Sequence, residues 1–99
     1  MKKIAEQTEN AIKAEAVAML IKNHLSWIGS DESMPSRDRR YVQGWYADKM
    51  ICETYEDAEY EALSDEAKRA VFFGIGAKFE AVKAQADAKW SAAKILLGI

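Results

Sequence analysis

The sequence predicts an all-α protein: a single domain over residues 1–99, built as an antiparallel three-helix bundle with a long carboxyl-terminal helix. Two observations lead to this prediction. One proline and five glycines accompany abundant alanine, glutamate and lysine, a composition that favours helices over sheets. Apolar side chains also recur every three or four residues over residues 3–28, 37–63 and 65–97, as they do on the packed face of a helix.

The first expected helix runs from about Lys3 to Ile28 and has two neighbouring apolar lines. The line with the regular three-four spacing comprises Ile4, Ala11, Ala14, Ala18, Ile21, Leu25 and Ile28. The line beside it comprises Val17, Leu20, His24 and Trp27. Gly29 suits the position after the helix, because glycine adopts the left-handed conformation without a steric penalty. Residues 29–36 contain Pro35 and three serines, so we expect a linker there, with Ser36 capping the next helix.

The second expected helix covers residues 37–63. Its packed face is predicted to comprise Tyr41, Trp45, Cys52, Tyr55, Ala62 and Leu63. Asp48 and Glu59 interrupt this face, and each would need a cationic or hydrogen-bonding partner if it were buried. The acidic run from Glu53 to Glu61 opposes the helix dipole, which makes residues 53–63 the expected place for a bend. The carboxylates at positions 53, 57 and 61 are interpreted as a solvated acidic face rather than as a site for a divalent cation or a basic partner.

Ser64 is the expected cap of the third helix, and Asp65 and Glu66 suit its first turn. We favour an abrupt corner before this helix over a continuous, kinked helix. Two stripes run along the helix to Leu97. The small-residue stripe comprises Ala67, Ala70, Gly74, Ala77, Ala81, Ala84, Ala88 and Ser91. The bulky stripe comprises Phe72, Ile75, Phe79, Val82, Ala86, Lys89, Ala93 and Leu96.

A helix with two such stripes is expected to be covered on two sides. The other two helices are shorter and partly polar, so the sequence predicts a homodimer in which a second copy covers the remaining side. The expected dimer interface comprises Ala81, Ala84, Ala88, Trp90, Leu96 and Leu97.

Composition and charge narrow the classes of function. The formal charge of −2 provides no attraction to nucleic acid or anionic membranes. No apolar run approaches the ~20 residues of a membrane span. A single cysteine, Cys52, fits a reducing compartment. The start of the chain at Met1 is followed by Glu6 and Glu9 rather than by an apolar signal sequence. We therefore expect a cytoplasmic protein without a membrane segment.

Catalytic and metal-binding patterns are absent from the sequence. It contains no pair of cysteines or histidines and no Glu-x-x-His step, so we expect neither a metal nor a cofactor. His24 is interpreted as a half-buried packing residue and Cys52 as a small hydrophobic residue. An enzyme built around His24, Cys52, Asp48 and Glu59 is a hypothesis that we do not favour.

The residues most typical of recognition lie early in the second helix. Arginine binds phosphate and carboxylate with two parallel hydrogen bonds, and aromatic rings stack on bases. The expected partner-binding residues are Arg37, Arg39, Arg40, Val42, Tyr46 and Met50. The alternative is that the three arginines only pair with the neighbouring carboxylates of Asp31, Glu32 and Asp38. Helical phase places Val42, Tyr46 and Met50 in line with Arg39 and away from the predicted packed face, as an exposed contact surface.

The sequence therefore predicts a small protein-binding module that acts by occupying the surface of a partner. Inhibitors of host defence systems carried by bacterial viruses or mobile elements often have this build, although no residue motif supports the analogy. The alternative is a nucleic-acid or nucleotide binder. It would use Arg37, Arg39, Arg40, Trp45 and Tyr46. We favour an acidic protein partner over DNA or RNA.

Overall fold

A computed structural model describes residues 4–26 and 36–98, and these residues form four helices and no strand. The helices are α1 (Glu6–Ser26), α2 (Ser36–Thr54), α3 (Asp57–Glu61) and α4 (Asp65–Leu97). The all-α prediction is confirmed for this part of the chain. The predicted helix ends at Lys3 and Ile28, the cap at Gly29 and most of the predicted linker lie outside the described residues, as does the side chain of Ser36. None of the described helices has both the length and the apolar character that a membrane span requires.

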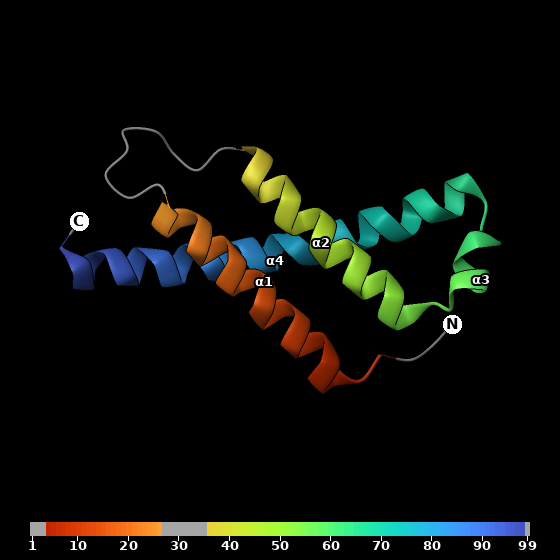
Figure 1. The fold of residues 1–99 in the computed structure, drawn as a ribbon, viewed down its shortest axis with the longest axis horizontal. Coiled ribbons are helices and arrows are strands. Elements are labelled where there is room, and N and C mark those ends of the chain that lie inside the picture. Colours follow the sequence, from red (N-terminus) through yellow and green to blue (C-terminus); the bar gives the residue numbers. More distant parts are fainter. Residues whose placement is uncertain (1–3, 27–35, 99) are drawn as a thin grey trace.

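Helix α4 determines the shape of the molecule. Its 33 residues span about 50 Å at about 1.5 Å per residue. This length matches the longest dimension of the molecule, which measures 50 × 26 × 17 Å. Helices α1 and α2 lie side by side and cross α4 near its middle (Figure 1). Both ends of α4 consequently extend beyond the helices that cover its centre.

The hydrophobic core lies where these three helices meet. Helix α2 places the Tyr46 ring against the Phe79 ring of α4, with the ring centroids 5.7 Å apart and the planes at 42°. Tilted aromatic pairs of this kind add to the stabilisation that comes from burial alone. The buried side chains are Ile12, Ala16, Val17, Leu20, Val42, Tyr46, Ala47, Met50, Phe79, Val82 and Ala86.

In α1 the structure buries the second predicted line and not the first. Val17 and Leu20 are buried, together with Ile12 and Ala16, while His24 is half-buried. The first line is mostly exposed, at Ala11, Ala14, Ala18 and Leu25. Alanine offers little apolar area, so packing selects the face that removes more apolar surface from water. Regular spacing alone therefore misplaced these four residues, although Ile4 and Ile21 of the same line are partly buried and pack against the core.

In α2 the predicted packed and exposed faces are reversed. Val42, Tyr46 and Met50, which were predicted to form an exposed contact surface, are 0%, 0% and 3% exposed and belong to the core. Tyr41 is 69% exposed, and Cys52 is exposed as well. A carboxylate explains the choice of face. Burial of the Tyr41 side of α2 would have buried Asp48, whereas the observed orientation leaves Asp48 in water.

The prediction of three helices, with a single helix over residues 37–63, is wrong, because the described residues form four helices and this stretch is divided into α2 and α3. The division falls within residues 53–63, where a bend was expected. Helix α2 ends at Thr54, and the short α3 begins at Asp57, where the backbone N–H of Glu56 donates to the Glu59 carboxylate at 3.3 Å. The proposed ladder of carboxylates at positions 53, 57 and 61 is therefore wrong as one helical face, because Glu53 belongs to α2 and the other two belong to α3. Glu59 is half-buried on α3, away from the α2 core.

The expected corner before α4 is also confirmed. Figure 1 shows the chain reversing direction after α3, and Ser64 caps α4 by accepting a hydrogen bond from the Ala67 N–H at 3.1 Å. At the other end, Gly98 adopts the left-handed conformation with φ of 71° and closes the helix. Both ends of this long helix are thus capped by residues suited to the position.

The two stripes of α4 differ in burial. The bulky stripe is buried only at its centre, at Phe79, Val82 and Ala86, while Phe72, Lys89 and Leu96 are exposed. Ala67 of the small-residue stripe is half-buried. The rest of this stripe is exposed in the single chain, at Ala70, Gly74, Ala77, Ala81, Ala84, Ala88 and Ser91. The prediction that α4 is covered on two sides is therefore wrong for one chain alone. It stays a prediction for an assembly of two.

Candidate functional site

Two adjoining depressions lie along the side of α2 that faces away from the core. The first is lined by Arg40, Tyr41, Gly44, Trp45 and Asp48. The second is lined by Asp48, Ile51, Cys52, Tyr55, Asp57, Tyr60 and Glu61. Because Asp48 borders both, they form one continuous hollowed surface, which we call the α2 outer face and define by the residues in these two lists.

Helical spacing accounts for this surface. Tyr41, Trp45, Asp48, Cys52 and Tyr55 follow one another at three- and four-residue steps and therefore share one side of the chain. The line that contains Val42, Tyr46 and Met50 is turned towards the core. The orientation of α2 about its own axis thus determines both which residues enter the core and which form the α2 outer face.

The lining of the first depression includes a glycine, Gly44. No atom lies within 4 Å of the position that a Cβ of Gly44 would occupy, so the absent side chain leaves open space between Tyr41 and Trp45. Trp45 is partly buried and packs against the core, which holds its ring in place. The ammonium of Lys49 lies 6.0 Å from the Trp45 ring centroid. The Trp45 ring is therefore held in place, with the Lys49 ammonium on one side and the exposed Tyr41 ring nearby.

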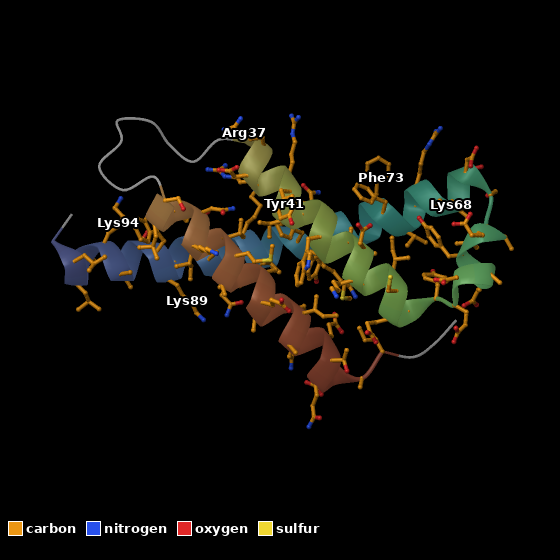
Figure 2. The ribbon with its side chains drawn as sticks, in the orientation of Figure 1. Arg37, Tyr41, Lys68, Phe73, Lys89 and Lys94 are labelled. Carbon is orange, nitrogen blue, oxygen red and sulfur yellow. The ribbon has the colours of Figure 1, made fainter. Side chains whose placement is uncertain are left out.

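The arginines lie near the amino-terminal end of this surface. Arg37 and Arg40 are exposed and Arg39 is half-buried. Figure 2 shows Arg37 extending from the start of α2, one turn before Tyr41. The structure thus brings Arg40, Tyr41 and Trp45 together, as the sequence analysis expected. It removes Val42, Tyr46 and Met50 from the expected set, because these side chains are buried.

The second depression combines aromatic rings with carboxylates. The Tyr55 and Tyr60 ring centroids are 5.9 Å apart, with the planes at 57°. Lys68 of α4 borders this place: its ammonium lies 5.4 Å from the Tyr60 ring centroid and 3.6 Å from a Glu61 carboxylate oxygen. Asp48 and Asp57 complete the lining with two further carboxylates.

Sequence reasoning missed Gly44, Asp57, Tyr60 and Glu61 as members of this surface. The signal that could have found it was Asp48. A carboxylate inside an otherwise apolar stripe marks the stripe as exposed, because burial of an unpaired charge is costly. Tyr60 and Glu61 reach the surface only because the chain turns before α3, and helical spacing does not encode that turn.

The residues of the enzyme hypothesis do not converge. His24 stacks on Trp90 of α4, with the ring centroids 5.2 Å apart and the planes at 7°, and its Nε2 lies 3.5 Å from Asp87 Oδ1. Cys52 and Asp48 lie together on the α2 outer face. Trp90, expected in the dimer interface, is half-buried in this contact with α1 of its own chain.

One buried polar group lies in the core close to the candidate site. The Tyr46 hydroxyl is buried and has no hydrogen-bond partner among the described residues. Burial raises the pKa of Tyr46 above its usual 10.0, and the negative charge of Glu9 raises the pKa further. The hydroxyl therefore stays neutral and contributes no charge to the neighbouring surface.

The described residues contain no group of three histidine, cysteine, aspartate or glutamate side chains placed to hold a metal ion. Comparison with known proteins gives no match to a family model, to a curated protein or to a solved structure. A functional proposal must therefore be based on the geometry and chemistry of the α2 outer face itself.

Proposed function

We propose that this protein is a non-enzymatic protein-binding module that occupies the surface of a partner with its α2 outer face. One observation supports the proposal most: the exposed Tyr41, three half-buried aromatic side chains and an arginine line two adjoining depressions on one side of α2. Tyrosine, tryptophan and arginine are the residues that most often dominate the energy of protein interfaces. The hollows provide places for side chains of the partner.

The two ends of this surface carry opposite charges. Arg37 and Arg40 lie towards its amino-terminal end, while Asp57 and Glu61 lie at the α3 end. From Arg40 to Tyr55 the α2 outer face extends about 22 Å at about 1.5 Å per residue. Opposite charges at the two ends would favour one orientation of a partner segment over the reverse. Inhibition of a host defence protein by a virus or mobile element is one role that such a mode of action would serve.

We expect Tyr41→Ser to weaken partner binding at least about tenfold, because tyrosines are enriched among the residues that dominate the energy of protein interfaces. The substitution should leave the fold intact, since Tyr41 is 69% exposed. The measurement is affinity capture from a lysate of the organism that carries the gene, with mass-spectrometric identification. The proteins captured by the wild type should be lost with Tyr41→Ser and with Arg40→Ser.

Leu25→Ser is the matched control, because Leu25 is a large hydrophobic residue (48% exposed) on α1, outside the α2 outer face and the small-residue stripe of α4. It should retain the captured proteins. A captured set that is unchanged by Tyr41→Ser would refute the proposed use of the α2 outer face.

A nucleotide or nucleic acid is the competing ligand, because Arg40, Tyr41 and Trp45 line one depression. An arginine beside aromatic rings can hold a phosphate and stack a base. The acidic α3 end and the net charge of −2 oppose this reading. A single-stranded oligonucleotide titrated at low salt decides between the ligands. Tight binding that falls steeply with added salt would replace the protein-binding proposal.

We also propose that two copies associate through the exposed small-residue stripe of α4. Ala84 lies midway between Phe73 and Ile95, which are both exposed. In an antiparallel pair of α4 helices centred on Ala84, each Phe73 would lie opposite the Ile95 of the other copy, and alanines would meet between them. Small residues allow such helices to approach closely. The exposed Leu96 and Leu97 would extend the contact.

Sedimentation at micromolar concentration tests this association. The wild type should sediment as a dimer. Ala84→Glu should sediment as a monomer, because it places charge at the centre of the contact. Ala18→Glu is the matched control on the exposed side of α1 and should remain dimeric. A wild-type monomer would contradict the dimer proposal.

A further inference from the structure

We propose that the second depression of the α2 outer face binds the guanidinium group of an arginine side chain presented by the protein partner. This inference depends on the protein-binding function proposed above and specifies the chemistry of the partner. It concerns the hollow between the end of α2 and α3, lined by residues of both helices.

The shape of the hollow comes from the turn between α2 and α3. Ile51 and Cys52 belong to the last turns of α2, while Tyr60 and Glu61 belong to α3. Because the chain changes direction after Thr54, the two helices form two walls around an open space of about 390 Å³. The lining combines apolar side chains with carboxylates. This combination suits an arginine, which has a flat cationic group on an apolar stem.

The charge of this hollow is not balanced within the described chain. Asp48, Asp57 and Glu61 contribute three carboxylates. Lys68 pairs with Glu61, but among the described residues no cation forms an ion pair with Asp48 or Asp57. A cationic side chain from a partner would gain from these carboxylates, whereas an anionic one would be repelled.

An independent contact shows that this lining accommodates a cation. The Lys68 ammonium reaches the rim from α4 and lies near both the Tyr60 ring and the Glu61 carboxylate, at 5.4 Å and 3.6 Å. The Tyr55 ring stands 5.9 Å from Tyr60 and offers a second aromatic face. Cations are attracted to the faces of such rings. Because Lys68 already engages Tyr60 and Glu61, a cation from a partner would use the Tyr55 ring with the Asp48 and Asp57 carboxylates of the same lining.

Arginine fits this combination better than lysine. The guanidinium group is planar, so it stacks on an aromatic ring while it donates two parallel hydrogen bonds to a carboxylate. The other end of the α2 outer face carries Arg37 and Arg40, which would repel a basic side chain. The charge pattern therefore directs an arginine of the partner to the α3 end.

The test is a titration of the ¹⁵N-labelled full chain with acetyl-arginine-amide, followed by amide chemical shifts. We expect saturable shifts centred on residues 48–61. Acetyl-citrulline-amide has nearly the same shape without the charge and should bind at least about tenfold more weakly. Equal shifts with both probes, or arginine-induced shifts spread evenly over carboxylates elsewhere, would overturn the proposal.

Two variants and a matched control locate the site. Asp57→Asn combined with Glu61→Gln should abolish the shifts, and Asp48→Asn, which lies on α2, should weaken them without touching α3. Glu15→Gln combined with Glu66→Gln removes the same charge from exposed positions outside the hollow and should leave binding unchanged. Retained binding in the Asp48 and Asp57 variants would place the arginine elsewhere.

The failure of this inference is distinguishable from the failure of the proposed function. If Tyr41→Ser loses the captured partner but acetyl-arginine-amide does not bind, the protein-binding function stands and the arginine site is refuted. If the probe binds at the hollow but capture is unaffected by Tyr41→Ser, the arginine site stands and the proposed use of the whole α2 outer face is refuted.

Discussion

Phe79→Ala should lower the free energy of unfolding by about 3–5 kcal/mol, the usual cost of removing a buried phenylalanine. Phe79 is 1% exposed and its ring contacts Tyr46 where α1, α2 and α4 meet. A domain of this size is stable by about 5–15 kcal/mol, so the loss is a large share of the total. In a thermal melt followed by circular dichroism, the midpoint should fall by more than about 12 °C.

Phe73→Ala is the matched control for this experiment. It makes the same substitution on the same helix at a side chain that is 71% exposed. Measured at a concentration below that at which the proposed dimer would form, it should change stability by no more than about 0.5 kcal/mol. A similar loss from both variants would show that α4 does not present Phe79 to the core.

Tyr46→Ser should also cost about 3–5 kcal/mol, because it removes a fully buried aromatic ring from the contact with Phe79. Tyr41→Ser makes the same substitution one and a half turns earlier on α2. Since Tyr41 is 69% exposed, it should change stability by no more than about 0.5 kcal/mol. Urea unfolding of the two variants measures the difference.

This pair of variants distinguishes the two possible orientations of α2. The orientation expected from sequence, with Tyr41 packed and Tyr46 exposed, would give the opposite order of stabilities. Met50→Ser provides a second check, because Met50 is 3% exposed and its loss should also destabilise the fold. A stable Tyr46→Ser variant together with an unstable Tyr41→Ser variant would overturn the structural account of the α2 outer face.

The sequence predicted the features of this fold that are encoded locally. The Ser64 cap, the break within the acidic run from Glu53 to Glu61 and the extent of α4 all follow from short-range preferences of the residues involved. Helix caps and dipole effects act within one or two turns, so a single stretch of sequence contains the information. These predictions are confirmed because no distant contact opposes them.

The orientation of α2 could not be predicted in the same way. Its helix has apolar residues on both sides, at Tyr41 and Trp45 on one and at Val42 and Tyr46 on the other. The spacing of apolar residues favours burial of the two sides almost equally. Which side is buried depends on the fit to Phe79 and on the cost of burying Asp48. The fit to Phe79 and the cost of burying Asp48 both depend on contacts between helices. The sequence analysis therefore assigned both the core and the candidate site to the wrong sides of α2.

The acidic end of the site was missed for a related reason. Tyr60 and Glu61 join Asp48 only after the chain turns between α2 and α3. The sequence predicted a bend in this region, but the direction of a bend depends on the packing of the elements on either side. A list of residues at helical spacing therefore could not bring these side chains into one hollow.

Nitration of the native protein with tetranitromethane, mapped by mass spectrometry, tests most directly which side of α2 meets the solvent. Tyr41 should be modified rapidly, while Tyr46 should remain protected until the chain is unfolded, because its ring and hydroxyl are enclosed by the core. Modification of Tyr46 at the rate of Tyr41 in the folded protein would contradict the orientation of α2, and with it the proposed binding surface.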